Sequence, residues 1–331
     1  MPANLTPQYL EAEKKYREAK TAQEKLRALR EMFAVMPKHK GTDRLQGDVK
    51  RKIAMLSDEI EHAKKSGGKR HNEYVPREGA GQVVLLGPPN SGKSSIIDRL
   101  THATPEIGPY PFTTKKPLPA MMPYEDIQIQ MVDMPPITEA YYEGWLSNIV
   151  RDCDLVLLVV GVDDLDPDGS LKAIFKHMES ASVVFTGESV ARSDGADDYR
   201  TVMKKSLLAL NKVDLGEAGI VRDLVGPVIG DVPVWETSCK SGVGLEDLRR
   251  AIYEALSLVR VYTKIPGKKP DLFRPYVVTR GTTVMGIARL IHKDFAERLR
   301  FARVWGHARF EGQPVEKTYV LQDRDVIEIH I

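Results

Sequence analysis

The chain of 331 residues is poor in cysteine, with only Cys153 and Cys239. Two cysteines fit neither a disulfide framework nor a metal site, and such low use is typical of a reducing compartment. Long apolar segments are also lacking: the longest run, residues 155–162, is too short to span a bilayer and predicts a central parallel strand. The first residues are polar and charged, so no signal peptide is visible. We therefore expect a cytoplasmic protein without a membrane partner.

A strong excess of charge is lacking as well, because the formal net charge is only +2. The charges are nevertheless unevenly divided along the chain. Residues 1–72 carry a net charge of +7, residues 73–261 carry −10, and residues 262–331 carry +5. An acidic middle segment between two basic ends suggests a polyanionic partner, with RNA as the leading candidate. The alternative is that these charges only form solvated surfaces.

The first 72 residues predict two helices joined by a short break. Apolar residues recur at close to helical spacing over 7–35 and again over 43–65. The break between them, residues 36–41, contains a proline and a glycine. We therefore expect a helical hairpin over 1–72, which either packs on the rest of the protein or lies on RNA.

Two further units are predicted after this hairpin. Strands alternate with helices over 80–260, which predicts an α/β fold with a doubly wound, mainly parallel sheet. Residues 262–331 predict a separate, small mixed sheet. Its expected elements are strands over 276–278, 301–305, 319–321 and 325–331, and a helix over 284–298. The predicted domains are thus 1–72, 80–260 and 262–331.

A phosphate-binding loop pattern, G-x-x-x-x-G-K-[ST], is matched by Gly87-Pro88-Pro89-Asn90-Ser91-Gly92-Lys93-Ser94. A buried strand is predicted before it over 82–86 and a helix after it over 94–100, which is the context this loop requires. Backbone N–H groups and the helix N-terminus would surround phosphate oxygens. Lys93 can reach the β- and γ-phosphates, and the Ser94 hydroxyl can bind Mg²⁺. The predicted phosphate contacts are Gly87, Pro88, Pro89, Asn90, Ser91, Gly92, Lys93, Ser94 and Ser95.

The base is predicted to be guanine. A buried strand over 207–210 leads to Asn211-Lys212-Val213-Asp214, the N-K-x-D pattern of GTPases. The Asp214 carboxylate can accept two hydrogen bonds from guanine, whereas adenine would leave it unpaired at a cost of a few kcal/mol. The stem of Lys212 can lie along the base plane. A later loop is expected to contact guanine O6 through a backbone amide; its residues are Ser238, Cys239 and Lys240.

Two more segments are predicted to sense the γ-phosphate. The run Tyr110–Thr114 follows the phosphate-binding loop and its helix, and we favour Thr114 over Thr113 as a ligand of Mg²⁺. Asp133 ends the next predicted strand and would hold Mg²⁺ through water. Lys93 and Thr114 are the predicted catalytic residues. Because no side chain is an evident general base, catalysis would consist of electrostatic positioning.

The sequence after Asp133 departs from the usual D-x-x-G pattern. Pro136 occupies the glycine position and has no N–H to donate to a γ-phosphate. Ile137 stands where Ras-type enzymes carry a glutamine that orients water, and an apolar side chain cannot do this. The water must therefore be placed by another group, a partner protein or a bound cation, or hydrolysis is very slow.

Together these motifs and the Tyr-Pro-Phe-Thr-Thr run resemble the Obg superfamily of GTPases, which carry an apolar residue after the second switch. Other segments are similar to the developmentally regulated GTP-binding (DRG) type. They are residues 36–42 and the runs 261–264, 282–284, 291–293, 304–306 and 325–329, which resemble the TGS domain that closes DRG proteins. The resemblance implies a P-loop GTPase sheet and a C-terminal β-grasp fold. Asp133 and Asn211 are too close to hold the extra domain that DRG proteins insert there, so we expect a compact relative.

The resemblance also implies a function: a GTP-binding switch with slow GTP hydrolysis that acts with RNA or the ribosome. Its expected ligands are GTP, GDP and Mg²⁺. Some related GTPases bind potassium at the position of Asn90, so this residue either binds K⁺ or only braces the loop. A regulatory protein is a further expected partner. The alternative is a nucleotide-responsive binding module with little or no GTPase activity.

A basic patch that faces phosphates is also expected in the C-terminal unit. Its residues are Lys293, Arg298, Arg300, Arg303 and Arg309. Trp305 lies within the same stretch of sequence, where it belongs either to the core or to a platform that stacks on bases.

Overall fold

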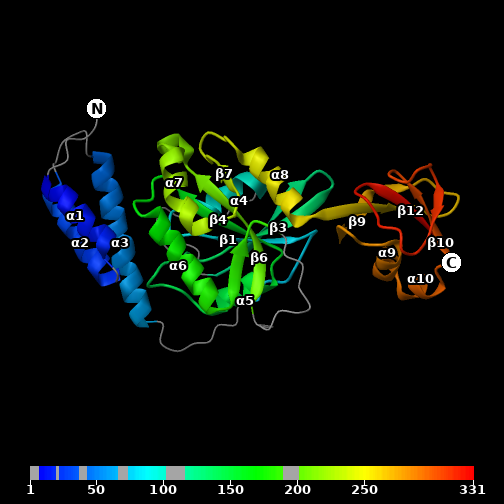
Figure 1. The fold of residues 1–331 in the computed structure, drawn as a ribbon, viewed down its shortest axis with the longest axis horizontal. Helices are drawn as coiled ribbons and strands as arrows, with labels where there is room; N and C mark the ends of the chain where they lie inside the picture. The colour runs from blue at the N-terminus through cyan, green and yellow to red at the C-terminus, as the bar shows by residue number, and fades with distance from the viewer. Residues whose placement is uncertain (1–6, 20–21, 37–42, 66–73, 102–115, 189–200) are drawn as a thin grey trace.

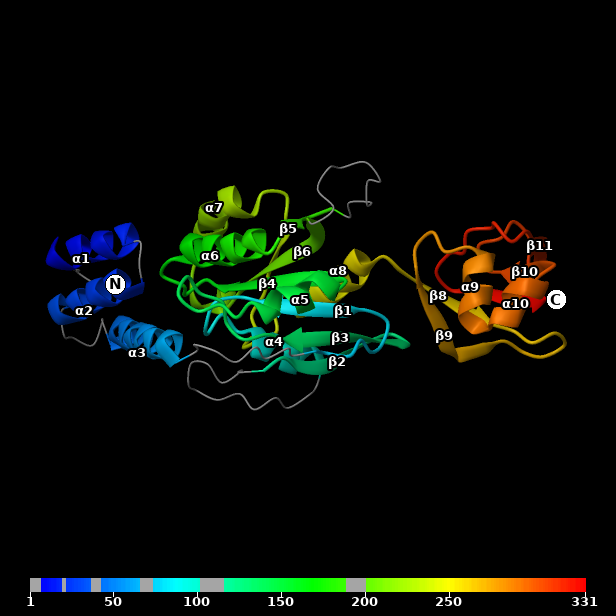
Figure 2. The ribbon, with the colours of Figure 1, turned by 90° about the horizontal axis from the view of Figure 1, so that it is seen from below.

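The computed structural model describes residues 7–19, 22–36, 43–65, 74–101, 116–188 and 201–331. They form three units that follow one another along the long axis of the molecule (Figure 1). The N-terminal unit is helical, the central unit is a sheet with helices on both faces, and the C-terminal unit is a smaller sheet with two helices (Figure 2). No helix in the described residues is both long enough and apolar enough to cross a membrane.

The N-terminal unit contains one helix more than the predicted hairpin. Its helices are α1 (Pro7–Glu18), α2 (Ala22–Val35) and α3 (Asp43–Lys65). The segment expected as one helix over 7–35 is two, because α1 ends at Glu18, Ala19 is not helical and α2 begins at Ala22. The three helices share a small apolar core that includes Tyr16, Leu29, Met32 and Val49.

The central unit contains a seven-stranded sheet. Its strands are β1 (Gln82–Leu86), β2 (Leu118–Tyr124), β3 (Ile127–Asp133), β4 (Leu155–Gly161), β5 (Val183–Thr186), β6 (Val202–Asn211) and β7 (Val234–Glu236). They lie in the order β2-β3-β1-β4-β6-β5, and β7 also pairs with β6. Within the described part of the sheet, only β2 runs antiparallel to its neighbour. The predicted mainly parallel sheet is confirmed.

Helices cover both faces of this sheet (Figure 2). One face packs against α4 (Lys93–Thr101) and α8 (Leu245–Leu256), and the other against α5 (Trp145–Asp152), α6 (Pro167–Ser180) and α7 (Ala218–Ile229). Strands β1 and β4 are buried along their whole length, so successive residues enter the two cores in turn. As a result, the carboxyl ends of the parallel strands meet at one edge, where loops can form a ligand site.

The C-terminal unit is a five-stranded mixed sheet with the expected β-grasp character. Its elements are β8 (Leu258–Thr263), β9 (Asp271–Thr279), α9 (Val284–Ile291), α10 (Lys293–Arg298), β10 (Phe301–Trp305), β11 (Gln313–Val315) and β12 (Asp325–His330). The strand order is β11-β10-β12-β8-β9, and β8 is parallel to β12.

Two predictions for this unit are wrong in detail. The helix expected over 284–298 is two helices, because His292 is extended and its Nδ1 accepts a hydrogen bond from the Asp294 N–H at 3.2 Å, which starts α10. The expected strand over 319–321 is only an isolated bridge between Val320 and Thr283. The domain boundaries stay predictions, although β8 already begins at Leu258.

A cluster of charged side chains joins the central and C-terminal units. Arg260 on β8 is 3% exposed and donates to Asp323 Oδ2 at 2.6 Å and to Asp126 Oδ1 at 2.8 Å. It also pairs with Glu125, which forms the turn between β2 and β3 together with Asp126. We call these four residues the Arg260 cluster. It fixes the C-terminal unit to the far end of the β2–β3 hairpin from Asp133.

Candidate nucleotide-binding site

The segment Gly87–Ser94 joins β1 to α4, and its last two residues form the start of α4, as its pattern predicts. Two of its residues have positive φ, Asn90 at 58° and Gly92 at 97°. A side chain on Gly92 would collide with the Asn211 amide, so this position requires glycine for both its conformation and its close approach. The Ser91 hydroxyl is buried without a hydrogen-bond partner among the described residues, which is the state expected of a group that awaits a ligand.

Lys93 is buried at the start of α4, and its ammonium group folds back on the loop. It donates to the carbonyl oxygens of Gly87 and Pro88, both at 3.0 Å. Burial lowers the pKa of Lys93 to about 8, while the nearby Asp133 carboxylate acts in the opposite direction. The loop therefore holds a cation at its centre, where phosphate oxygens can replace the two carbonyls.

Strand β6 brings Asn211 and Lys212 against this loop. Asn211 is buried and donates from Nδ2 to the Ser91 carbonyl at 3.1 Å. Lys212 has a left-handed backbone, with φ of 64°, and donates from Nζ to the Asn90 carbonyl at 2.6 Å. Two motifs about 120 residues apart in the sequence therefore form one surface.

The remaining residues predicted for the base surround Asp214. Its Oδ1 accepts a hydrogen bond from the Ser238 hydroxyl at 2.6 Å, and Lys240 Nζ lies 3.8 Å from its Oδ2. Cys239 Sγ lies 3.6 Å from Asn211 Oδ1, and burial raises the pKa of this thiol to about 11. The structure thus places both predicted base-contacting segments side by side at the edge of the sheet.

Asp133 and Ser94 lie together beside the phosphate-binding loop. Ser94 Oγ donates to Asp133 Oδ2 at 2.5 Å, and the carboxylate is buried. A hydroxyl and a carboxylate are the hard oxygen ligands that suit Mg²⁺, so the donors present fit that ion. Thr114, the third predicted ligand, and Thr113 lie outside the described residues.

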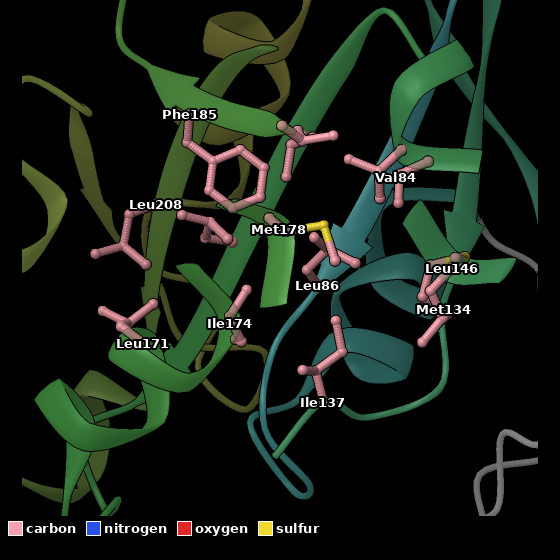
Figure 3. Close-up of a cluster of buried hydrophobic side chains, with 14 of the residues drawn as sticks. Val84, Leu86, Met134, Ile137, Leu146, Leu171, Ile174, Met178, Phe185 and Leu208 are labelled. Carbon is pink, nitrogen blue, oxygen red and sulfur yellow. The ribbon is translucent and has the colours of Figure 1, made fainter. Parts of the chain in front are cut away.

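The segment after Asp133 is packed into the protein. Pro136 and Ile137 are buried, and Figure 3 shows Ile137 among the same apolar side chains as Leu86 and Met134. The Ile137 N–H donates to the Gly87 carbonyl at 3.2 Å. This backbone amide, one residue after the usual glycine, is therefore bonded to the phosphate-binding loop itself.

Sequence reasoning missed a neighbour of Lys212. Asp163 follows β4, and its carboxylate oxygens accept from Lys212 Nζ at 2.9 and 3.1 Å. No local pattern marks this aspartate. The one usable signal is its place just after a buried parallel strand, since such positions share the edge that binds ligands.

The N-terminal helices pack on the segment that follows β4. The sequence predicts either that they pack on the protein or that they lie on RNA. Lys52 Nζ of α3 lies 3.1 Å from Asp164 Oδ1, and Lys25 Nζ of α2 lies 3.3 Å from Asp166 Oδ2. Burial would raise the pKa of Asp164, yet Lys52 helps to hold it below its usual value. Packing on the central unit is therefore the arrangement seen.

A cavity of about 140 Å³ lies between these helices and the loop. Its walls include Met55 and Lys52 from α3 and Pro89 and Ser91 from the loop. Asn90 forms another part of this wall, and its Nδ2 lies 3.2 Å from Met55 Sδ. The side chain predicted for potassium thus faces the N-terminal unit.

Comparison with known sequences agrees with this geometry. Residues 82–186 match the family described as 50S ribosome-binding GTPase, and residues 259–331 match the TGS domain. An uncharacterised GTP-binding protein of Halobacterium salinarum is 30% identical over 93% of this chain and 98% of its own length. The developmentally regulated GTP-binding protein 1 of Xenopus laevis is 27% identical over 88% of this chain and 94% of its own length.

The alignment with the Halobacterium protein runs over 366 positions, more than the 331 residues of this chain, so the relative has segments that this chain lacks. Among solved structures, the G domain of the Thermotoga maritima FeoB iron transporter is 26% identical, with a TM-score of 0.37. That match covers 53% of this chain and 98% of the FeoB domain.

Proposed function

Since this chain belongs to the family of developmentally regulated GTP-binding proteins, we propose that it is a GTP-driven switch with slow hydrolysis that acts with RNA or the ribosome. One observation carries the proposal. Asn211 and Lys212 of the guanine motif donate to backbone carbonyls of the phosphate-binding loop. A single ligand with guanine at one end and phosphates at the other fits such a surface.

The proposed binding follows from the groups already placed there. Lys93 exchanges its two carbonyl partners for phosphate oxygens, and the amides of residues 88–94 surround the same phosphates. Asp214 accepts hydrogen bonds from guanine, with Ser238 holding its carboxylate in place. The exchange at Lys93 replaces two neutral acceptors by anionic oxygens, and charge-assisted hydrogen bonds are the stronger ones.

Magnesium, when bound, neutralises charge on the β- and γ-phosphates. Ser94 and Asp133 would hold it, because their oxygens already converge beside Lys93. The Ser94 hydroxyl could bind the ion through a lone pair while its O–H still donates to Asp133, and Asp133 would act through water.

Slow hydrolysis follows from the segment after Asp133. Pro136 supplies no N–H, and the Ile137 N–H is engaged by Gly87. The Ile137 side chain is buried and cannot orient water. Water must therefore be placed by a partner or by a cation such as K⁺ near Asn90.

The partner proposal is supported by charge and by the family description. The central unit matches a family described as ribosome-binding, and the N-terminal and C-terminal segments are both basic. Ribosomes and RNA are polyanions that basic surfaces attract strongly at low salt.

Single-turnover hydrolysis of GTP, measured with and without ribosomal subunits, tests the proposal. We expect a slow reaction alone that subunits accelerate, while ATP competes poorly. Running the same assay in K⁺ and in Na⁺ at equal ionic strength tests whether K⁺ assists hydrolysis. Equal binding of ATP and GTP would contradict the guanine site.

One observation favours a second candidate, a binding module that scarcely hydrolyses GTP. The Ile137 N–H donates to the Gly87 carbonyl at 3.2 Å, which holds the start of the second switch to the phosphate-binding loop. If no rate above background appears with subunits or with K⁺, while GTP still changes binding to them, this second function is the correct one.

A further inference from the structure

The loop between β8 and β9 and the first residues of β9 expose apolar and basic side chains together. Phe273 is 92% exposed, Ile265 is 61% exposed and Leu272 is 54% exposed. Exposed apolar side chains forgo the free energy that burial provides, so a group of three exposed apolar side chains marks an interaction site. With Lys268, Lys269 and Arg274, all of them exposed, these residues are called the β8–β9 patch.

The cations of this patch have no acidic partner. Within the described residues, no ion pair joins Lys268, Lys269 or Arg274 to a carboxylate. Lys264 differs, because its Nζ lies 2.9 Å from Glu328 and 4.1 Å from the centre of the Trp305 ring. Lys264 therefore supports the fold, whereas the patch cations remain available to a partner.

Local hydrogen bonds shape the loop. The Lys268 N–H donates to the Ile265 carbonyl at 2.9 Å. The Phe273 N–H donates to Asp271 Oδ1 at 3.0 Å. Phe273 lies near the start of strand β9, so its phenyl ring is presented from a hydrogen-bonded backbone, which reduces the entropy lost on binding.

The patch lies away from the central unit. Leu258 pairs with Thr279 at one end of the β8–β9 ladder, and Thr263 pairs with Asp271 at the other. The Arg260 cluster holds the first end against the β2–β3 hairpin, so the loop at the second end projects from the molecule (Figure 2). A partner can reach it while the units stay joined.

We propose that the β8–β9 patch binds single-stranded RNA, with Phe273 stacking on a base and the three cations contacting phosphates. This proposal rests on the RNA or ribosome partner proposed above and assigns its contact to named residues. An exposed aromatic ring beside unpaired cations is the combination that single-strand binding uses. The C-terminal segment, with a net charge of +5, attracts the same polyanion over a longer range.

A protein partner fits the patch less well. Stable protein interfaces bury about 800 Å² on each side around a core poor in charge. Here three apolar side chains are interspersed with three cations over the loop and the start of β9. The tryptophan expected as a stacking platform is also unsuitable, because Lys264 lies over the Trp305 ring and Gly312 packs beside it.

Fluorescence anisotropy with the full chain and a labelled single-stranded RNA of roughly 20 nucleotides tests the proposal, since this length exceeds one single-strand site. We expect Phe273→Ala to weaken binding about five- to a hundredfold, the effect of losing one stacked base. Phe310→Ala is the matched control, because Phe310 is 65% exposed on the same unit. It should bind as the wild type does.

The salt dependence of RNA affinity separates the role of the patch cations from that of the Phe273 ring. Replacing both Lys268 and Lys269 by alanine should flatten the slope of log affinity against log salt by about 1.4. Arg289→Ala, also exposed, is the charge-matched control for Arg274→Ala. Equal losses in the control variants, or none in the patch variants, would overturn the assignment.

Co-sedimentation with ribosomal subunits distinguishes this inference from the proposed function. If the wild type binds RNA or subunits and the patch variants bind equally well, only the β8–β9 patch is refuted. If the wild type binds neither at low salt, both proposals fail. If Phe273→Ala abolishes subunit binding but leaves RNA binding unchanged, the patch binds a protein and the RNA assignment is wrong.

Discussion

At the scale of single residues, guanine recognition depends on one carboxylate and the groups around it. Ser238 donates to Asp214 Oδ1, which leaves the second oxygen directed toward Lys240 at 3.8 Å. We expect Asp214→Asn to shift preference from GTP toward xanthosine triphosphate by roughly tenfold or more, because an amide donates where the carboxylate accepted. Competition binding with both nucleotides measures this shift.

The control for that change is Lys240→Ala. Lys240 is 81% exposed, so its loss should leave the preference for GTP intact. If Asp214→Asn also keeps the wild-type preference, Asp214 does not read the base.

The depressed pKa of Lys93 predicts a pH dependence of binding. Burial lowers this pKa to about 8, and the anionic phosphates of a bound nucleotide would favour the charged ammonium and raise it. Binding therefore takes up a proton above about pH 8, so GTP affinity should fall by up to tenfold per pH unit there. Calorimetry from about pH 7 to 9 measures the profile.

Lys93→Arg separates this titration from other effects of pH. A guanidinium stays charged throughout that range, so the profile of the variant should be flatter than that of the wild type. A wild-type profile as flat as the variant's would show that Lys93 does not titrate on binding.

At the scale of elements, the segment between β3 and α5 predicts weak discrimination between GDP and GTP. Pro136 cannot donate to a γ-phosphate, and a hydrogen bond to a charged group contributes about 1.5–3 kcal/mol. We expect similar affinities for GDP and GTP in the wild type, and a preference for GTP at least tenfold stronger in Pro136→Gly. The dissociation constants of GDP and GTP, measured for the wild type and for Pro136→Gly, test this prediction.

A strong GTP preference in the wild type would mean that another group reads the γ-phosphate. The Ile137 N–H is the nearest such group on this segment, and it would first have to leave the Gly87 carbonyl.

The elements that the sequence predicts well are those with local signals. Leu155–Gly161 form a buried strand because an unbroken apolar run can only be covered on both faces. The loop at Gly87 follows from residues contiguous in sequence. The break at His292 was missed, since it depends on one capping residue inside an otherwise helical pattern.

At the scale of the whole molecule, the Arg260 cluster predicts coupled stability of two units. Arg260→Met leaves Glu125, Asp126 and Asp323 together without their buried cation, and we expect the free energy of unfolding to fall by about 3 kcal/mol. Urea denaturation of the full chain measures this loss.

Arg324→Met is the matched control. Arg324 is 59% exposed and pairs with Glu125 at 2.6 Å, so its loss should cost about 1 kcal/mol at most. Equal losses in the two variants would mean that the cluster does not couple the units.

Acid should remove the stabilisation that the Arg260 cluster gives to the folded protein. Burial alone would raise the pKa of Asp323, but hydrogen bonds from Arg260 hold it below its usual value. Such a carboxyl stabilises the fold above its unfolded pKa and stops doing so as the pH falls through its folded pKa. The difference between wild type and Arg260→Met should therefore shrink below about pH 4.

These long-range contacts mark the limit of prediction from sequence. Lys52 and Asp164 are 112 residues apart, and Arg260 and Glu125 are 135 apart. Nothing in the spacing of single charged residues selects such partners, because any exposed lysine or aspartate has the same local signature. The motifs place the nucleotide site, but the packing of the units around it comes only from the three-dimensional structure.

The Arg260 cluster also bears on how the protein is made. Synthesis proceeds from the N-terminus, and domains generally fold as units during it. When Arg260 is added, Glu125 and Asp126 are already present, but Asp323 follows 63 residues later. The central unit can therefore fold and bind its nucleotide first, and the β2–β3 hairpin then receives the C-terminal unit as the last step of assembly.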